Sequence, residues 1–181
     1  IKEFIALPKT GAQVAARWQQ TIAALSSKPL EPSQLMLEEG RPIEFESRGV
    51  HVSIGLSGTK SGWISKTTEF YTTISVRLQN NQPNFYLYQH QNTAPKEASA
   101  LPEAQLSREL AAHYKLRSQD NVEGTLASLS QALLQALPDL FSVDGKSVTA
   151  TYGSLMLSPE KTQLLVEAMT ELALQSNQLY R

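Results

Sequence analysis

Hydrophobic residues recur along this chain with two different periods. From 12 to 26 they recur every three or four residues, which predicts a helix with one apolar face formed by Val14, Trp18, Ile22 and Leu25. Residues 28–40 contain two prolines and no sustained period, so we expect a connector there. From Ile43 onward the period becomes two, which is typical of strands with one buried face.

The first alternating segment predicts a hairpin that turns at Arg48-Gly49. Apolar residues occupy every second position on both sides of this turn, from Ile43 to Leu56. The register that puts all of them on one face pairs Glu46 with His51, Phe45 with Val52 and Ile43 with Ile54. Arginine is not favoured at the first position of a two-residue turn, so the turn type stays open.

A second hairpin is expected from residues 70–78 and 85–90, with a turn at 80–83. Its face-segregating register pairs Leu78 with Phe85, Val76 with Leu87 and Arg77 with Tyr86. Residues 57–68 lie between the two hairpins and are rich in Ser, Gly, Thr and Lys. We expect them to form a mobile loop that contains Trp63.

The second half of the chain predicts more helix. Residues 91–105 indicate a long polar loop, and residues 106–117 fit a helix followed by a short strand. A clear amphipathic helix follows at 121–137, and a hairpin is expected at 141–152 around Asp144-Gly145. A last helix begins at Ser158, with Pro159 at its first position.

The order of these elements favours an α+β fold, in which an antiparallel sheet of hairpins packs with amphipathic helices in a single domain. Within it we expect an N-terminal helix and connector at 1–40, two hairpins at 41–91, and a strand-helix-hairpin-helix unit at 106–181. A chain of 181 residues with 41% hydrophobic residues is long enough for one core.

The amino-acid composition argues against several classes of function. A net charge of -1 argues against nucleic acid and anionic membranes as partners, because both need clustered Lys and Arg. The absence of cysteine excludes disulfides, zinc-thiolate sites and cysteine nucleophiles. No apolar run reaches the roughly 18–20 residues of a membrane span. The chain begins at Ile1 rather than Met, so we expect a fragment or a processed form.

The second half also has a family resemblance. The features that carry the resemblance are the stretch Tyr114-Lys-Leu-Arg-Ser-Gln-Asp120, the leucine-rich helix after it, the turn Val143-Asp-Gly-Lys-Ser-Val148 and the helix at Ser158. Their pattern resembles uncharacterised bacterial domains that often follow membrane-spanning helices. The resemblance covers residues 41–175 in pattern. It implies a membrane tether upstream and no known chemistry. The implied location is the bacterial cytoplasm or the soluble side of a tethered protein.

His51 is the candidate for acid–base chemistry. The predicted register sets it opposite Glu46, with Ser53 and Glu44 diagonal to it on the same face. A carboxylate, an imidazole and a hydroxyl are the components of nucleophilic catalysis. Glu–His pairs on a solvated sheet face are also ordinary structural features. No histidine has a second ligand at metal spacing, so we expect no metal site and no cofactor.

The second predicted hairpin carries the candidates for binding. Its polar face would hold Arg77, Tyr86, Tyr88 and His90. Arginine and tyrosine are favoured at binding hot spots, although tyrosine is also common in strands for structural reasons. Trp63 is either an exposed anchor or a side chain that packs on the core.

Two short motifs resemble known catalytic or binding loops but lack their context. Residues 55–61 resemble a phosphate-binding loop, yet Thr59 separates Gly58 from Lys60 and no helix is expected to follow. Ser158 and Lys161 form a Ser-x-x-Lys motif at a helix start, where a serine ordinarily caps the helix.

These observations favour a non-enzymatic module that binds or scaffolds a protein partner. One alternative is a hydrolase that uses His51 with Glu46 or Ser53. Another is a carrier that holds a small apolar ligand between sheet and helices. An enzyme needs a pocket in which a histidine meets its partner, a binder needs an accessible face, and a carrier needs an internal apolar cavity.

Overall fold

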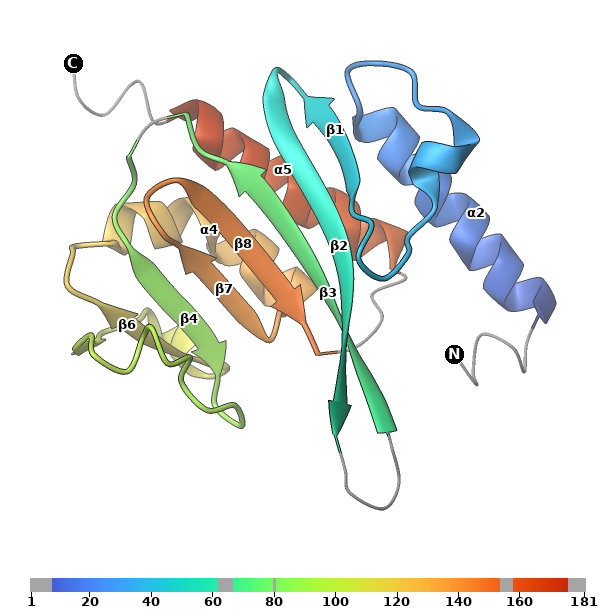
Figure 1. Ribbon diagram of the computed structural model, residues 1–181. Coiled ribbons are helices and arrows are strands. Elements are labelled where there is room, and N and C mark those ends of the chain that lie inside the picture. Colours follow the sequence, from blue (N-terminus) through green and yellow to red (C-terminus); the bar gives the residue numbers. More distant parts are fainter. Residues whose placement is uncertain (1–7, 62–66, 80, 154–157, 176–181) are drawn as a thin grey trace.

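One antiparallel sheet organises the chain in the computed structural model, which describes residues 8–61, 67–79, 81–153 and 158–175 (Figure 1). Its eight strands lie in the order β1-β2-β3-β8-β7-β4-β6-β5. They are β1 (Ile43–Ser47), β2 (Val50–Ser61), β3 (Thr67–Arg77), β4 (Phe85–Gln89), β5 (Glu103–Ala104), β6 (Tyr114–Ser118), β7 (Leu140–Val143) and β8 (Ser147–Tyr152).

Helices cover one face of this sheet. The two that lie against it are α4 (Glu123–Ala136) and α5 (Pro159–Gln175), and α2 (Pro8–Leu25) packs beside α5 (Figure 1). Two short helices, η1 (Pro32–Leu35) and α3 (Arg108–Ala111), lie in the connections. The predicted α+β class with an antiparallel sheet and amphipathic helices is confirmed. In the described residues, no helix combines the length and the apolar character that a membrane crossing requires.

The core forms between the sheet and these helices. Alternate residues of each long strand are buried there, and the stacked rings of Phe85 and Phe141 lie 6.1 Å apart between centroids. Trp18 and Ile22 of α2 are buried, as their spacing predicts, whereas the side chain of Val14 lies outside the described part. Helical and strand periodicity therefore locate the core correctly.

Two buried tyrosines fix the end of α4 to the sheet. The hydroxyl of Tyr114 donates to Pro138 O over 2.9 Å, and that of Tyr152 donates to Ala136 O over 2.7 Å. The bond from Tyr152 satisfies one of the carbonyl groups that the end of α4 leaves without a helical partner, and the bond from Tyr114 holds the residue that follows the C-cap. Burial raises the pKa of both phenols well above the ordinary value, so they stay neutral donors.

The first hairpin has the predicted register. Glu46 is opposite His51, Phe45 is opposite Val52, and Ile43 is opposite Ile54. Arg48 and Gly49 both have positive φ, at 52° and 79°, which is the signature of a type I′ turn. This turn type matches the twist of the two strands, so it forms even with arginine at its first position.

The second predicted hairpin is wrong, because β3 and β4 are not neighbours. β8 and β7 lie between them, so Val76 is opposite Val148 and Leu87 is opposite Phe141. The predicted pairs Leu78–Phe85, Val76–Leu87 and Arg77–Tyr86 therefore do not form. Alternation determines which side chains face the core, but it does not choose the neighbouring strand, and the hairpin at 141–152 satisfies the same pattern.

Leu78 and Asn84 lie beside the turn of the β7–β8 hairpin. Leu78 N donates to Lys146 O over 2.7 Å. Asn84 Oδ1 would lie 3.1 Å from a Cβ atom at Gly145, which has a φ of +84°. Glycine suits this turn for two reasons: it adopts a positive φ without strain, and it has no Cβ atom that would contact Asn84.

The predicted mobile loop at 57–68 is wrong at both of its ends. β2 continues through Ser61 and β3 begins at Thr67, and the paired residues run from Ser57–Tyr71 to Ser61–Thr67. Residues 62–66, with Trp63, lie outside the described part.

The helices, the strand and the hairpin that we expected between 106 and 175 are present. A short helix and a strand lie within 106–118, a long helix follows, and α5 begins at Pro159 directly after Ser158. The hairpin at 141–152 turns around Asp144-Gly145. The expected loop at 91–105 contains the two-residue strand β5 at the edge of the sheet.

Candidate functional site

The face of the sheet that points away from α4 and α5, here called the open face, is polar. One row of side chains crosses all eight strands on this face, namely Glu44, Ser53, Ser75, Thr149, Ser142, Tyr86, Arg117 and Glu103. The hydroxyls of Ser75 and Thr149 lie 3.2 Å apart in the middle of it. None of the described helices lies over this face, so these hydroxyl groups meet solvent (Figure 1).

One end of the open face is covered by the segment 91–102. Arg117 Nη1 donates to Leu101 O over 2.9 Å, and Ala98 of the same segment is fully buried. Tyr88 lies beneath this cover and is only 4% exposed, although it is on the open face of β4. The accessible part of the open face is therefore the part formed by β1, β2, β3, β8 and β7.

A groove of 540 Å³ lies in this accessible part, where the segment after β3 meets the β7–β8 turn. Three neighbouring strands supply its polar lining, and the segment after β3 closes one side with Leu78, Gln79 and Asn81. We call it the open-face groove, and its polar lining comprises His51, Ser53, Ser75, Arg77, Lys146 and Ser147.

The β7–β8 turn that carries Lys146 is tightly held. Asp144 Oδ1 accepts hydrogen bonds from Lys146 N at 3.0 Å, from Ser147 N at 2.8 Å and from the Ser147 hydroxyl at 3.1 Å. Partial burial raises the pKa of Asp144, but these hydrogen bonds outweigh it and leave that pKa below the ordinary value. The backbone at the groove's rim is thus fixed by one carboxylate whose negative charge is stabilised by these donors.

The lining of the open-face groove is basic. Arg77 and Lys146 line it together with His51, and none of the described residues that line it is Asp or Glu. Among the residues that the structure describes, neither Arg77 nor Lys146 forms an ion pair with a carboxylate. Free guanidinium and ammonium groups beside serine hydroxyls are suited to bind a carboxylate or another oxyanion.

The acid beside His51 is not the predicted one. Glu46 is directly opposite His51 in the hairpin, but its carboxylate pairs with Lys28 Nζ at 3.1 Å. His51 Nε2 instead lies 3.8 Å from Glu44 Oε1. Opposite positions fix how close the Cβ atoms are, whereas a long side chain turns toward the stronger charge, here a lysine of the connector.

The contacts of a nucleophilic serine are not assembled at this site. A hydroxyl nucleophile needs a hydrogen bond to its base, and within the described residues none joins Ser53 to His51. The His51–Glu44 pair is also exposed, with side-chain exposures of 43% and 59%. The described residues contain no group of three or more His, Asp or Glu side chains that could hold a metal ion.

Comparisons with known proteins give one structural similarity. No model of a protein family matches the chain, and no curated protein matches its sequence. The chain is similar to the crystal structure of the mycobacterial trehalose monomycolate transport factor A, TtfA, with a TM-score of 0.48 and 10% sequence identity, over 93% of this chain and 94% of that chain. A similarity of this size carries no argument about function, so the candidate site rests on its own geometry.

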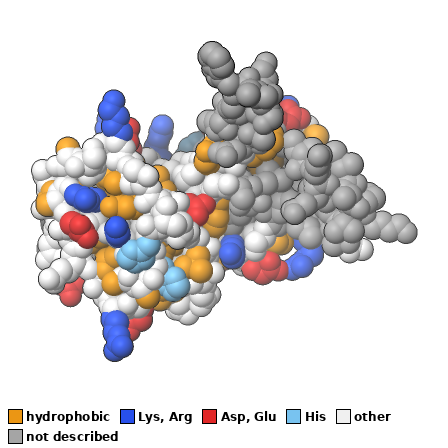
Figure 2. Space-filling model, turned by 90° about the horizontal axis from the view of Figure 1, so that it is seen from below, with side chains coloured by type: hydrophobic (Ala, Val, Ile, Leu, Met, Phe, Trp, Pro, Cys, Tyr) orange, Lys and Arg blue, Asp and Glu red, His pale blue; other side chains and the backbone are white. Residues whose placement is uncertain are grey.

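The structure separates the other predicted binding residues from Arg77. β8 and β7 lie between Arg77 and Tyr86, and Tyr88 is buried. His90 lies where β4 ends, with its Nε2 2.7 Å from Ala111 O and its backbone amide bonded to His113 O. Figure 2 shows this end of the molecule, where histidine side chains lie among hydrophobic ones. The predicted binding face of one hairpin is thus divided between two regions.

Two polar residues that line the open-face groove could not be predicted from the sequence. Lys146 and Ser147 follow the strongest turn signal in the chain, but nothing local indicates that this turn lies beside β3. Of the predicted candidates, His51, Ser53 and Arg77 are brought together here.

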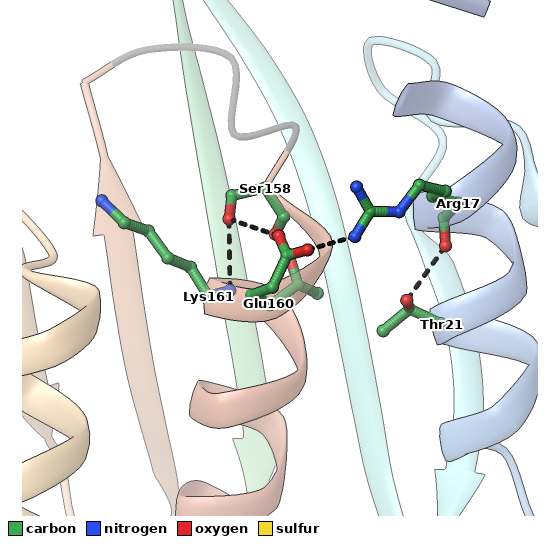
Figure 3. A network of polar contacts seen from close by, with 6 residues as sticks. Arg17, Thr21, Ser158, Glu160 and Lys161 are labelled. Atoms are coloured by element: carbon green, nitrogen blue, oxygen red, sulfur yellow. Dashed lines mark hydrogen bonds and ion pairs between the residues drawn. The ribbon is translucent and has the colours of Figure 1, made fainter. Parts of the chain in front are cut away.

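The Ser-x-x-Lys motif at the start of α5 is a helix cap. Ser158 Oγ accepts from Lys161 N over 3.2 Å and donates to the carboxylate of Glu160, which pairs with Arg17 of α2 (Figure 3). The backbone amide of Glu160 and the Arg17 guanidinium hold the pKa of that carboxyl below its ordinary value. The motif therefore connects two helices and has no free nucleophile.

Proposed function

We propose that this protein is a non-enzymatic binding module whose open-face groove holds an acidic segment of a protein partner. The observation that carries the proposal is a groove of 540 Å³ with Arg77, Lys146 and His51 in its lining and no carboxylate. The helices occupy the other face of the sheet, so this groove is open to a macromolecule rather than enclosed.

The chemistry of the groove favours recognition of carboxylates on an extended segment. Arginine binds a carboxylate through two parallel hydrogen bonds, and lysine adds a point charge. The hydroxyls of Ser53 and Ser75 can donate further bonds along the same stretch. Both cations are exposed, so they contribute mainly to the association rate and the specificity, and salt weakens the interaction.

Titration with a capped peptide of alternating Glu and Ser, followed by amide NMR shifts at low ionic strength, tests this function. We expect the largest shifts at Ser53, Ser75 and Lys146, with a matching Lys-Ser peptide giving none. The double variant Arg77→Gln/Lys146→Gln should lose this binding. The matched variant Arg108→Gln/Lys115→Gln removes two exposed cations that do not line the groove and should keep it.

The outcome that contradicts the proposal is equally specific. Equal binding by the two double variants, or shifts confined to other surfaces, would show that the open-face groove does not recognise the acidic peptide. The same titration in added salt gives a second check, because recognition by Arg77 and Lys146 should weaken as ionic strength rises.

A further inference from the structure

A second groove lies on the helix side of the sheet, at the β5–β6 end. It has a volume of 690 Å³ and lies between α3, residues 104–107 and the first turns of α4. It is separate from the open-face groove, because the sheet lies between the two. We call it the α3–α4 groove.

The floor of the α3–α4 groove is apolar. Leu110 of α3, Leu116 of β6 and Leu126 of α4 form it and are at most 5% exposed. Leu106 and Leu134 are half-buried and continue the apolar lining toward solvent. The α3–α4 groove forms because the elements at this end of the sheet are short: β5 has two residues and α3 has four.

The rim of the α3–α4 groove is acidic. Glu109 comes from α3, Asp120 from the connection after β6, and Glu123 from the first turn of α4, and all three are exposed. Asp120 is held in place, because its Oδ2 accepts from Asn84 N over 3.1 Å. None of its described lining residues is Lys, Arg or His. A groove with an apolar floor and a negatively charged rim favours a ligand that is apolar where it meets the floor and positively charged where it meets the rim.

We infer that the α3–α4 groove docks an amphipathic helix of a protein partner, whose apolar face fills the leucine floor and whose Lys or Arg residues meet the acidic rim. Helices dock in such grooves through apolar residues at i, i+3, i+4 and i+7. A fatty acid fits less well, since its carboxylate would meet three carboxylates. Addition of a strand to β5 is also disfavoured, because β5 offers only two residues for a ladder.

The direct test uses two capped synthetic peptides with leucines at i, i+3, i+4 and i+7, one with lysines and one with glutamates at the flanking positions. The lysine peptide should bind the intact chain, gain helical circular dichroism, and shift the amide signals of Leu110, Val122 and Leu126. The glutamate peptide should bind at least about tenfold more weakly.

Three variants test whether the lysine peptide binds in the α3–α4 groove. Ala127→Trp should block the groove, since Ala127 is an exposed lining residue of α4 whose replacement does not disturb the core. Glu109→Gln/Glu123→Gln should weaken the lysine peptide by about tenfold, whereas the matched Glu97→Gln/Glu167→Gln should not. Thermal unfolding of each variant checks that it is folded.

Several outcomes would overturn the inference. They are no binding of the lysine peptide, equal binding of both peptides, gain of strand rather than helix signal, or preferential binding of a fatty acid. The Arg77→Gln/Lys146→Gln variant should bind the lysine peptide unchanged. That comparison separates a failure of this groove from a failure of the open-face groove.

Discussion

Trp18 Nε1 donates a hydrogen bond to Thr162 Oγ1 over 3.1 Å in the buried contact between α2 and α5. Thr162 Oγ1 in turn donates to Ser158 O over 2.9 Å, so this hydroxyl both accepts and donates. Trp18 is 4% exposed and Thr162 is 1% exposed. The indole therefore buries its apolar surface and satisfies its one polar group at the same point.

Replacement of Trp18 by alanine should cost about 3–5 kcal/mol of the free energy of unfolding, because a large side chain leaves a cavity between two helices. Urea denaturation measures it. Gln20→Ala changes an exposed residue of the same helix and should have little effect. A loss below about 1 kcal/mol for Trp18→Ala would mean that α2 contributes little to the folded domain.

The hydrogen bond itself is tested at Thr162. Thr162→Val keeps the shape but leaves the Trp18 N–H without its acceptor, which should cost about 1–3 kcal/mol. Thr162→Ser keeps the hydroxyl and should lose less. A larger loss for Thr162→Ser than for Thr162→Val would show that the methyl group, rather than the bond, matters at this position.

Asp144 should make stability depend on pH. Its folded pKa lies below the ordinary value of about 3.9, so its contribution is complete above the unfolded pKa and is lost as pH falls through the folded pKa. Asp144→Asn should lower the free energy of unfolding by about 1 kcal/mol at neutral pH. In acid denaturation series, this difference should shrink below about pH 4.

The turn of the first hairpin should be improved by substitution. Arg48 has a φ of 52°, a conformation that asparagine adopts at lower cost than arginine, and Arg48 also pairs with Glu171 at 2.8 Å. In high salt, which screens the ion pair, Arg48→Asn should raise the unfolding free energy by a few tenths to about 1 kcal/mol. Arg48→Val, which is β-branched, should lower it. The opposite order would contradict the type I′ assignment.

Hydrogen exchange should divide the β2–β3 hairpin into two parts. Residues 57–61 and 67–71 pair only with each other among the described strands, whereas the inner part also pairs with β1 and β8 (Figure 1). A two-stranded ribbon is marginally stable by itself. Amides of 57–61 should therefore exchange faster than those of Val50–Ile54, and equal protection would indicate that another part of the chain covers the ribbon.

The sequence predicts those parts of the structure that depend on neighbours in the chain. The register of Glu46 with His51 follows from a two-residue turn and one apolar face, and the cap at Ser158 follows from Pro159 after it. The position of Arg77 could not be predicted, because its partner Ser147 comes from a strand far along the chain. The open-face groove depends on that pairing, so its residues were only partly identified.

The insertion of the β7–β8 hairpin between β3 and β4 has a consequence for protein synthesis. β3 and β4 leave the ribosome before the strands that must separate them exist, and direct pairing of the two would close the place that the hairpin must occupy. A nascent chain that ends before Leu140 thus exposes an unpaired edge on each of them, which are sites where chains aggregate. Synthesis of β7 and β8, rather than of the first hairpin, completes the sheet, and the early chain needs protection until then.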